Sequence, residues 1–547
     1  MRVAQAVGET LAQLGVRQVS GLIGSGNFAA TNALVAAGAS FVAARHEGAA
    51  ITIADAYSRV SGEVGVCSVH QGPGLTNAVT GLTEAAKSRT PLLLLAADNA
   101  AAAVRSNFRI DQDGLVGAVG AIPERVHTAE SAVADVVRSF RRAQLERRPV
   151  VLMLPLDVQA ADCRPAPLSP APRLYPVRPA MGAVQEAATA LTGASRPLII
   201  AGRGATLANA REPLEELGER VGALLATSAV ANGLFMGSPW ALGISGGFAS
   251  PVAAGLIAAS DVVLAVGVAL NMWTTSHGRL LSPDAVVVQV DSEAVALGAH
   301  HRVDVGVVGD AAETARALVE ELRLRDHRGS GWRTPEVERR LRLGSWRQAL
   351  FEDQGTGERI DPRALSIALD EVLPAERTVV VDSGHFMGWP AMYLRVPDPA
   401  GFVFTQAFQA VGLGLASAIG AAVARPERLT VAALGDGGAL MGLSELETVC
   451  RLGLRMLIVV YNDAAYGAEV HHFGPDGASL DLVRFPDTDF AALARGAGLE
   501  AVTVRRREDL GAVAEWVGGP RRPALLADAK VVPTVVAEWL DEAFRGH

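Results

Sequence analysis

A short cluster of glycines around one aspartate stands at the end of an apolar run in the last third of the chain. The four residues are Gly435, Asp436, Gly437 and Gly438, and the run before them is Leu429–Leu434. Glycines at such a place let backbone N–H groups approach phosphate oxygens, and a helix that starts there points its positive end at them. Mg²⁺ prefers a few oxygen ligands together with phosphate oxygens, and the Asp436 carboxylate is one such ligand. The cluster therefore favours a metal-anchored diphosphate, with an ordinary Gly-Asp-Gly turn as the alternative.

A second polar residue, Asn462, follows the next apolar run along the chain. Between the two runs, Ser444 and Glu447 have the spacing of a capping box and Gly453 is typical of a helix end, which predicts strand, loop, helix and strand. The carboxyl ends of parallel strands share one edge of a sheet, where open α/β sheets bind ligands. Asn462 would therefore join Asp436 at that edge, and its amide oxygen and a nearby carbonyl would complete the protein ligands of Mg²⁺.

The spacing between these two features carries a resemblance. Residues 438–461 separate Gly437 from Asn462, a gap of 24 residues. Gly-Asp-Gly followed at this distance by Asn resembles the thiamine-diphosphate (ThDP) motif of the superfamily that contains pyruvate oxidase, acetolactate synthase and benzoylformate decarboxylase. The resemblance implies that Asp436, Asn462 and the backbone carbonyl of Ala464 bind Mg²⁺. The superfamily usually has a second Asn where this chain has Asp463, which leaves the implied ligands intact.

The composition suits a large folded enzyme. At 547 residues the chain is too long for one core and suggests three domains of roughly 150–200 residues. Apolar residues make up 50% and the net charge is −9, which argues against a nucleic-acid partner. Apolar runs stop well short of the about 18 residues of a membrane span, and the N-terminus is not a signal sequence, so we expect a cytoplasmic protein. Cys67, Cys163 and Cys450 are isolated, so we expect packed thiols and neither disulfides nor a zinc site.

Three stretches alternate helical and strand patterns. We expect a first domain at 1–160, a Pro-rich linker at 161–182, a central domain at 183–325, a helical connector at 326–360 and a third domain at 361–547. The alternation predicts the α/β class, with three doubly wound parallel-sheet domains. In the first domain, Leu75–Lys87 is expected as one helix. In the central domain, Gly202 and Gly204 invite a dinucleotide interpretation, but Leu207 replaces the third glycine, so NAD is not expected. The resemblance implies pyrimidine-binding, central and diphosphate-binding domains, in that order.

The resemblance also assigns residues of the first domain. The segment around Glu47 resembles the one that carries the family's glutamate, which implies that Glu47 bonds N1′ of the aminopyrimidine; otherwise it is an acidic residue favoured in a helix's first turn. His70 stands where benzoylformate-decarboxylase-like members carry an active-site histidine, and an imidazole suits proton transfer near neutrality. Ser25 matches a serine that binds the substrate carboxylate, and Gln112 a glutamine that faces the thiazolium in carboligating members. The alternatives are a packing histidine, a turn serine and an exposed loop amide.

In the third domain the resemblance implies further contacts to the cofactor. Gly384 and His385 follow a strand where relatives cradle the diphosphate, and Val411 aligns with the apolar wedge that bends the cofactor. The implied cofactor-binding residues are Glu47, Gly384, His385, Val411, Gly435, Asp436, Gly437, Gly438, Asn462 and Tyr466. The sequence leaves open the roles of His277, His471 and His472.

These features imply an enzyme that uses ThDP and Mg²⁺ to decarboxylate a 2-oxo acid, or to join it through an enamine to an aldehyde or second carbonyl compound. Ser25 and His70 favour decarboxylation, whereas Gln112 favours carboligation. FAD is not expected, because the Arg-Phe-Asp-Asp element of acetolactate synthases is missing from Trp273–Gly278. The alternatives are a ThDP-binding relative without catalysis and a flavin-dependent oxidase on the same scaffold. The resemblance implies a homodimer as the minimal active unit, within a homotetramer, with no nucleic-acid or membrane partner.

Overall fold

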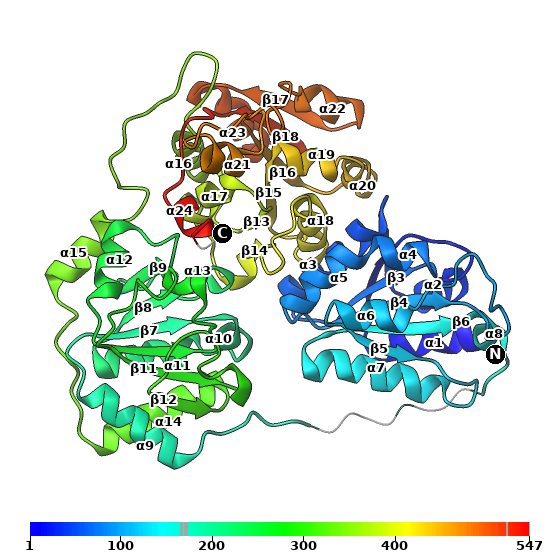
Figure 1. Ribbon diagram of the computed structural model, residues 1–547, viewed down its shortest axis with the longest axis horizontal. Helices are drawn as coiled ribbons and strands as arrows, with labels where there is room; N and C mark the ends of the chain where they lie inside the picture. Colours follow the sequence, from blue (N-terminus) through cyan, green and yellow to red (C-terminus); the bar gives the residue numbers. More distant parts are fainter. Residues whose placement is uncertain (165–167, 169–172, 521–522, 546–547) are drawn as a thin grey trace.

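The computed structural model of the chain has three α/β domains (Figure 1). It describes residues 1–164, 168, 173–520 and 523–545. Each domain is built on a six-stranded sheet, and the pairings between neighbouring strands of the three sheets are parallel. The expected fold class, three doubly wound parallel-sheet domains, is confirmed.

The first domain has the strand order β2-β1-β3-β4-β6-β5. Its strands are β1 (Gln18–Gly21), β2 (Ser40–Ala43), β3 (Gly65–Val69), β4 (Leu92–Asp98), β5 (Ile122–Arg125) and β6 (Pro149–Pro155). Its helices are α1 (Val3–Gln13), α2 (Phe28–Ala36), α3 (Glu47–Ser61), α4 (Pro73–Asn77), α5 (Val79–Lys87), α6 (Gln112–Ala118), α7 (Ala132–Glu146) and α8 (Leu156–Ala160). Strands β3, β4 and β6 are apolar and buried almost throughout, because helices cover both faces of the sheet.

One helix expected in this domain is wrong in its bounds. Leu75–Lys87 is two helices that meet at Ala78, and the first starts at Pro73. Proline suits the first turn of a helix, where its missing N–H has no partner to lose. Strand β5 escaped the sequence analysis because it is a short edge strand that contains Pro123, a residue that weakens any strand pattern.

The central domain has the strand order β12-β11-β10-β7-β8-β9. Its strands are β7 (Pro197–Ala201), β8 (Leu224–Thr227), β9 (Ala241–Ile244), β10 (Val262–Val266), β11 (Val286–Asp291) and β12 (Val305–Val308). Its helices are α9 (Met181–Thr192), α10 (Arg203–Leu207), α11 (Arg211–Val221), α12 (Pro251–Ala258), α13 (Met272–Thr275) and α14 (Ala311–Leu324). Its order reverses between β10 and β7, as in doubly wound dinucleotide folds.

The third domain has the strand order β14-β13-β15-β16-β18-β17. Its strands are β13 (Arg377–Val381), β14 (Phe402–Phe404), β15 (Leu429–Gly435), β16 (Met456–Asn462), β17 (Glu500–Val504) and β18 (Leu525–Lys530). Its helices are α16 (Pro362–Val372), α17 (Gly388–Tyr393), α18 (Gly414–Ala424), α19 (Asp436–Met441), α20 (Glu445–Leu452), α21 (Gly467–Phe473), α22 (Phe490–Gly496), α23 (Gly511–Gly518) and α24 (Leu540–Ala543). Counted along each domain, the first and third sheets have the same order, so these two domains share one topology.

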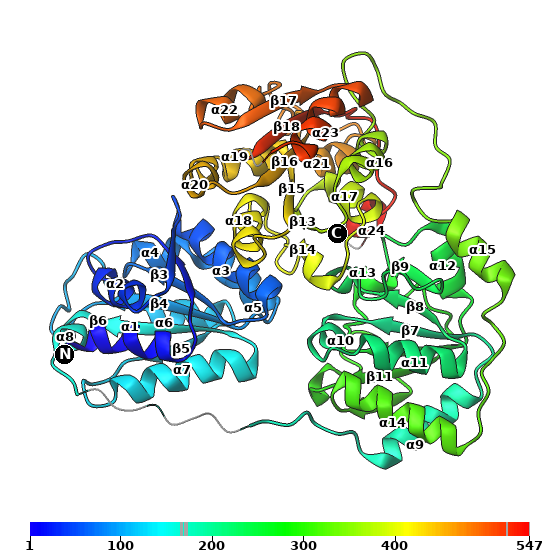
Figure 2. The same ribbon diagram turned by 180° about the vertical axis from the view of Figure 1, so that it is seen from behind.

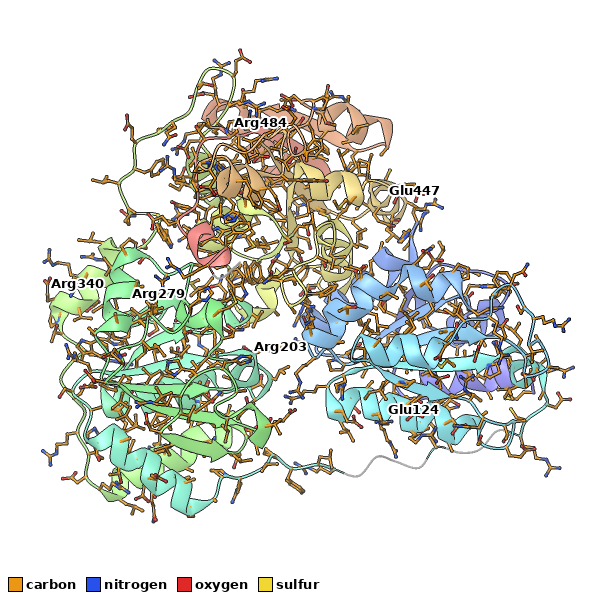
Figure 3. All side chains as sticks on the ribbon, viewed as in Figure 1. Glu124, Arg203, Arg279, Arg340, Glu447 and Arg484 are labelled. Atoms are coloured by element: carbon orange, nitrogen blue, oxygen red, sulfur yellow. The ribbon has the colours of Figure 1, made fainter. Side chains whose placement is uncertain are left out.

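The glycine cluster begins a short helix, α19, and not a loop. The expected capping box at the next helix is wrong, because the Ser444 side chain makes no capping hydrogen bond. Glu447 instead forms an ion pair with Arg45 of the first domain, with 2.6 Å between Oε2 and Nε (Figure 3). Cys450, expected as a packed thiol on the apolar face of this helix, is exposed.

The first and third domains pack against each other through α3 and α18 (Figure 2). A Cβ at Gly420 of α18 would lie 2.3 Å from the carbonyl oxygen of Ile53, so only glycine fits there. Beside this contact the buried Glu84 accepts the N–H of Phe408 at 2.7 Å and pairs with Arg59 at 2.9 Å. Apolar side chains of both domains form one continuous cluster, so each domain is fixed relative to the other.

Two segments join the domains. In the expected Pro-rich linker at 161–182, residues 165–167 and 169–172 lie outside the described part, and α9 starts at Met181. The expected helical connector at 326–360 contains α15 (Pro335–Leu343) and no further α-helix. Within residues 1–164, 168, 173–520 and 523–545, no helix is long and apolar enough to cross a membrane.

Candidate active site

The strand order of the first and third sheets reverses at one point, and the candidate residues gather there. The reversal lies between β1 and β3 in the first domain and between β13 and β15 in the third. Open α/β sheets bind ligands outside the carboxyl ends of the strands at such a point. Ser25 and His70 follow β1 and β3, and His385 and Asp436 follow β13 and β15. The predicted residues thus form two groups, one on each domain.

Asp436 and Asn462 lie at the carboxyl ends of two neighbouring strands of the third domain, Asp436 directly after β15 and Asn462 as the last residue of β16. Gly435, the last residue of β15, pairs in register with Tyr461 of β16. Asp436 and Asn462 directly follow these two paired residues in the sequence. Neighbouring strands lie roughly 4.8 Å apart. Asp436 is 8% exposed and Asn462 is fully buried. The two candidate ligands therefore stand side by side at the carboxyl edge of the sheet.

Hydrogen bonds fix the orientation of the Asn462 amide. Its nitrogen donates to the Asp528 carboxylate at 3.0 Å and to the Thr488 carbonyl at 3.2 Å. Its oxygen accepts the N–H of Ala464 at 3.2 Å and keeps a second lone pair. The buried Asp528 is itself held by the Lys530 ammonium, 2.9 Å away. The amide oxygen is therefore the atom offered to a cation. The supporting Asp528–Lys530 pair was missed by the sequence analysis, because only the strand register brings it to Asn462.

A second carboxyl group, Asp463, lies beside Asp436. The two side chains are hydrogen-bonded, and burial raises the pKa of both, with their mutual repulsion adding to the rise for Asp463. Two buried carboxyl groups in contact must share a proton or be neutralised by a cation. The oxygens of Asp436 and Asn462, with the Asp463 carboxylate beside them, are of the hard kind that Mg²⁺ prefers, so the residues present fit this ion. The ligand set implied by the resemblance, Asp436, Asn462 and the Ala464 carbonyl, stays a prediction.

The backbone after Asp463 bends sharply. Ala464 has a φ of 60°, which is uncommon for a residue with a side chain. Its carbonyl accepts the N–H of Phe485 at 2.8 Å, which leaves one lone pair for a cation. The Tyr466 ring stands edge-on to Phe485, with 4.8 Å between centroids, and lies 2.5 Å from where a Cβ of Gly437 would be. Residue 437 must therefore be glycine for this loop to close on α19.

The buried Asp382, at the end of β13, organises the neighbouring loops. Its carboxylate accepts the N–H groups of Ser383 at 2.8 Å and Gly412 at 3.1 Å, and burial raises its pKa to about 6. A Cβ at Gly438 would lie 2.5 Å from this carboxylate. Asp382 thus joins the loop after β13 to the loop at Gly412 and lies against the first turn of α19, and the sequence analysis passed over it. The available clue was a carboxylate directly after the apolar run Val379–Val381.

Val411, the predicted wedge, lies in one of these loops. It is 41% exposed, and its Cγ1 lies 3.3 Å from where a Cβ of Gly438 would be. The loop is shaped by two left-handed residues, Gln409 with φ 62° and Gly412 with φ 92°. Val411 therefore faces the first turn of α19, and its contact with a cofactor stays a prediction.

His385 is enclosed by α21 and the carboxyl-terminal segment. It is 7% exposed, its ring centroid lies 4.4 Å from that of His471, and its Nε2 accepts the N–H of Ala537 at 3.0 Å. Burial, assisted by His471, lowers the pKa of His385 to about 3, so the ring is neutral at ordinary pH. Gly384 before it has φ 143°, which favours glycine. His472, in contrast, stacks on Phe544 with 4.0 Å between centroids.

Glu47 begins α3 with a buried side chain, 7% exposed. Its Oε2 accepts the amide N–H of Asn77 at 3.0 Å, and among the described residues its Oε1 has no hydrogen-bond donor. The ring nitrogen of His46 caps the helix by accepting the N–H of Gly48 at 3.0 Å. A fixed, buried carboxylate with one free oxygen is the arrangement that a hydrogen bond to an aminopyrimidine needs.

Ser25 and His70 face each other across the reversal point of the first sheet. The distance from Ser25 Oγ to His70 Nε2 is 3.4 Å. His70 Nδ1 lies 3.0 Å from the carbonyl oxygen of Gln71, so Nδ1 carries the proton in the neutral ring and Nε2 is free to accept one. The Phe108 ring stands edge-on to the imidazole at 4.9 Å. A Cβ at Gly24 would lie 2.4 Å from the imidazole, so this close approach requires glycine. The pair can therefore exchange a proton with a bound molecule.

Gln112 is buried, 2% exposed, and is not an exposed loop amide. Its oxygen accepts the N–H of Gly72 at 2.9 Å, and its nitrogen donates to the Ala97 carbonyl at 3.1 Å. The amide therefore ties the loop after β3 to the end of β4. Its predicted place opposite the thiazolium stays a prediction.

A cavity of about 550 Å³ lies at the carboxyl ends of the central strands and is also lined by residues of the first and third domains, among them Ser88 and Met387. Arg203 lies there, between the central and first domains (Figure 3), and donates to the Ser88 carbonyl. Trp273 and Thr274, from the segment where a flavin-binding element was sought, also line it. The expectation that no FAD binds here stays a prediction.

Sequence comparison agrees with this architecture. The chain matches three family descriptions: "Thiamine pyrophosphate enzyme, N-terminal TPP binding domain" over residues 1–117, the "central domain" over 184–318 and the "C-terminal TPP binding domain" over 382–527. The chain belongs to the thiamine pyrophosphate (TPP, or ThDP) enzyme family, as the sequence motif implied.

Its relatives catalyse several reactions. It is 30% identical over 529 residues to a probable 2-ketoarginine decarboxylase of Pseudomonas aeruginosa, an alignment that covers 93% of this chain and 90% of that protein. It is 29% identical to the sulfoacetaldehyde acetyltransferase of Castellaniella defragrans, covering 93% and 89%. It is 27% identical to a probable acetolactate synthase large subunit of Methanocaldococcus jannaschii, covering 92% and 87%.

Proposed function

We propose that the protein uses ThDP and Mg²⁺ to decarboxylate a 2-oxo acid or to transfer the carbon fragment that remains to a carbonyl acceptor. The observation that carries the proposal is that the candidate residues form two half-sites, one on the first domain and one on the third. The sheets of these two domains have the same strand order. One half offers the free carboxylate oxygen of Glu47, and the other offers the oxygens of Asp436 and Asn462. These are the groups that would hold the two ends of ThDP.

At the diphosphate end, the residues would bind and orient. Asp436, Asn462 and the Ala464 carbonyl would hold Mg²⁺. Gly437 and Gly438 of α19 have no side chain, so phosphate oxygens could approach the backbone N–H groups there. At the other end, Glu47 would accept a hydrogen bond from the protonated N1′ of the aminopyrimidine. When bound, ThDP supplies a nucleophilic carbon that attacks a 2-oxo group and then accepts the electrons released with CO₂.

Ser25 and His70 support decarboxylation as one outcome. Ser25 would donate to the substrate carboxylate, and His70, 3.4 Å from its hydroxyl, would deliver or remove a proton near the reacting carbon. Carboligation remains compatible with the site, since acetolactate synthases and a 2-ketoarginine decarboxylase are both relatives.

A second copy of this chain would complete each site. The first domain exposes Phe28 (57%) and Phe108 (42%) near its candidate residues, and the third exposes Leu440 (45%) and Met441 (58%) on α19 and Val411 beside it. Large apolar side chains gathered at binding edges indicate surfaces that a partner covers. A two-fold dimer would set the first domain of one copy against the third domain of the other, with a homotetramer as a pair of dimers.

The test is to incubate the purified protein with ThDP, Mg²⁺ and a panel of 2-oxo acids, with and without aldehydes. We expect CO₂ release with an aldehyde or ketol product, and light scattering should give a dimer or tetramer. ThDP binding without turnover across a broad panel would support the non-catalytic relative instead. A yellow protein with a flavin spectrum would support the oxidase.

A further inference from the structure

The carboxyl-terminal segment after β18 returns to the diphosphate end of the third domain. Val535, Ala537 and Trp539 are buried, with 3%, 1% and 4% exposed. The Trp539 ring contacts Phe248 and Trp273 of the central domain, with centroids 5.9 and 6.4 Å apart. Two domains therefore hold this segment in place beside His385, and α24, which follows it, lies close to the central domain in Figure 1.

One hydrogen bond from this segment determines which nitrogen of His385 carries the proton. The N–H of Ala537 lies 3.0 Å from His385 Nε2. A backbone N–H can only donate, so Nε2 must be the unprotonated acceptor. The neutral ring must then carry its proton on Nδ1, where it is a donor.

The Nδ1 atom lies beside the start of α21, the helix that follows the candidate metal-binding residues. It lies 3.5 Å from where a Cβ of Gly467 would stand, at the first residue of α21. Among the described residues Nδ1 makes no hydrogen bond, although the ring is packed against His471 and Trp389. The fixed ring thus offers one N–H beside Gly467, which has no side chain, with the Asp463 carboxylate as the other polar group nearest the same position.

We propose that the Ala537 N–H holds His385 as the Nδ1–H tautomer, so that the carboxyl-terminal segment presents a neutral donor to a phosphate oxygen of ThDP. The proposal rests on the proposed function, because it concerns the same cofactor. It makes Ala537 a positioning residue that acts through His385. It also couples the packing of residues 535–539 to cofactor affinity.

A matched pair of substitutions at residue 385 tests the donor. In His385→Asn the amide can place an N–H near the position of Nδ1, whereas in His385→Gln the amide reaches the position of Nε2 instead. ThDP affinity in the presence of Mg²⁺ is measured by calorimetry, and inorganic diphosphate is used as a competitor. We expect His385→Gln to weaken ThDP on the order of ten- to a hundredfold, the effect of one lost hydrogen bond to a charged group, and His385→Asn to weaken it much less. Equal losses, or a greater loss in the Asn variant, would overturn the proposal.

A second pair tests the role of the segment. Ala537→Pro removes the N–H, and Ala537→Gly keeps it. In the chain with His385, we expect the Pro variant to bind ThDP more weakly and the Gly variant to keep its affinity. In the His385→Asn chain, which has no ring nitrogen to accept the Ala537 N–H, the Pro substitution should weaken ThDP binding no further. ¹⁵N chemical shifts of the His385 ring should change from the Nδ1–H pattern only in the Pro variant. Weakening of the same size in both backgrounds would mean a general disturbance and would refute the coupling.

Failure of this proposal differs from failure of the proposed function. If the unaltered protein binds no ThDP, the proposed function falls, while the ¹⁵N shifts still decide the tautomer of His385. If it binds ThDP and all four variants bind equally well, only the proposal on Ala537 and His385 falls.

Discussion

The substitution Glu47→Gln changes one atom type at a buried point of the first-domain half of the site. The side chain is 7% exposed, and Asn77 already donates to one of its oxygens at 3.0 Å. A glutamine of the same shape can keep that hydrogen bond through its amide oxygen. Its NH₂ must then occupy the position of the free carboxylate oxygen. The variant therefore offers a donor where the carboxylate offers an acceptor, while the packing of α3 is unchanged.

The exchange should slow proton removal from the reactive carbon of ThDP without a large loss of cofactor affinity. The protonated N1′ that favours the imino form of the pyrimidine needs an acceptor, and the glutamine side chain of the variant lacks one at that position. General acid–base contributions are typically on the order of 10²–10⁴ in rate, so we expect hydrogen–deuterium exchange at this carbon to slow by about that factor. Exchange is followed by quenching and proton NMR, and ThDP affinity by calorimetry.

Glu63→Gln is the matched control, because Glu63 accepts from Tyr57 at the far end of α3, away from both half-sites. It should exchange at the rate of the unaltered protein. Unchanged exchange in the Glu47 variant, with full ThDP occupancy, would refute the role assigned to this carboxylate. A complete loss of ThDP binding would show that Glu47 chiefly anchors the cofactor.

Three further predictions concern other parts of the site. Asp436→Ala should abolish Mg²⁺-dependent ThDP binding in calorimetry, whereas Asp463→Asn, which installs the residue usual in the superfamily, should keep it; equal binding by both would contradict the ligand assignment. His70→Ala should lower turnover of accepted 2-oxo acids roughly a hundredfold or more while ThDP affinity stays the same, and full turnover would remove its proton-transfer role. The pKa of His385 is lowered to about 3 by burial, so its usual value near 6.5 is regained on unfolding and stability is lost as pH falls below 6.5. The free energy of unfolding, measured in urea at pH 7 and pH 5, should fall between the two pH values by about 2 kcal/mol less in His385→Asn than in the unaltered protein. An identical fall in both proteins would contradict this.

The motif at the diphosphate end could be predicted because its parts are local. Gly-Asp-Gly and Asn462 each follow an apolar run, and parallel strands bring their carboxyl ends to one edge whatever the rest of the fold does. The strand pattern likewise predicted three α/β domains. The capping box at Ser444 failed because two residues at the right spacing do not form one when a stronger partner, here Arg45 from another domain, takes the Glu447 side chain.

The supporting residues could not be predicted, since contacts between distant segments define them. Asp528 reaches Asn462 only through the pairing of β16 with β18, and Ala537 reaches His385 across 152 positions of sequence. The contacts of Gln112 show the same limit. The alternative of an exposed loop amide is wrong, because two backbone groups distant in sequence hold both ends of the buried amide, while its place opposite the thiazolium stays a prediction.

The shared strand order of the first and third domains would allow one cofactor to be held at two ends, as we propose. Equal topology puts the reversal point at the same place in each sheet, so two such edges set face to face by a two-fold axis form two equivalent clefts. Each edge then needs only its own chemistry: an acceptor on α3 in the first domain, and a cation and phosphate cradle at α19 in the third. The central sheet has a different order and so cannot be a third equivalent edge. If the dimer instead paired like domains, the Glu47 edges would face each other and no cleft would contain both kinds of group, so a dimer structure decides whether this division of roles holds.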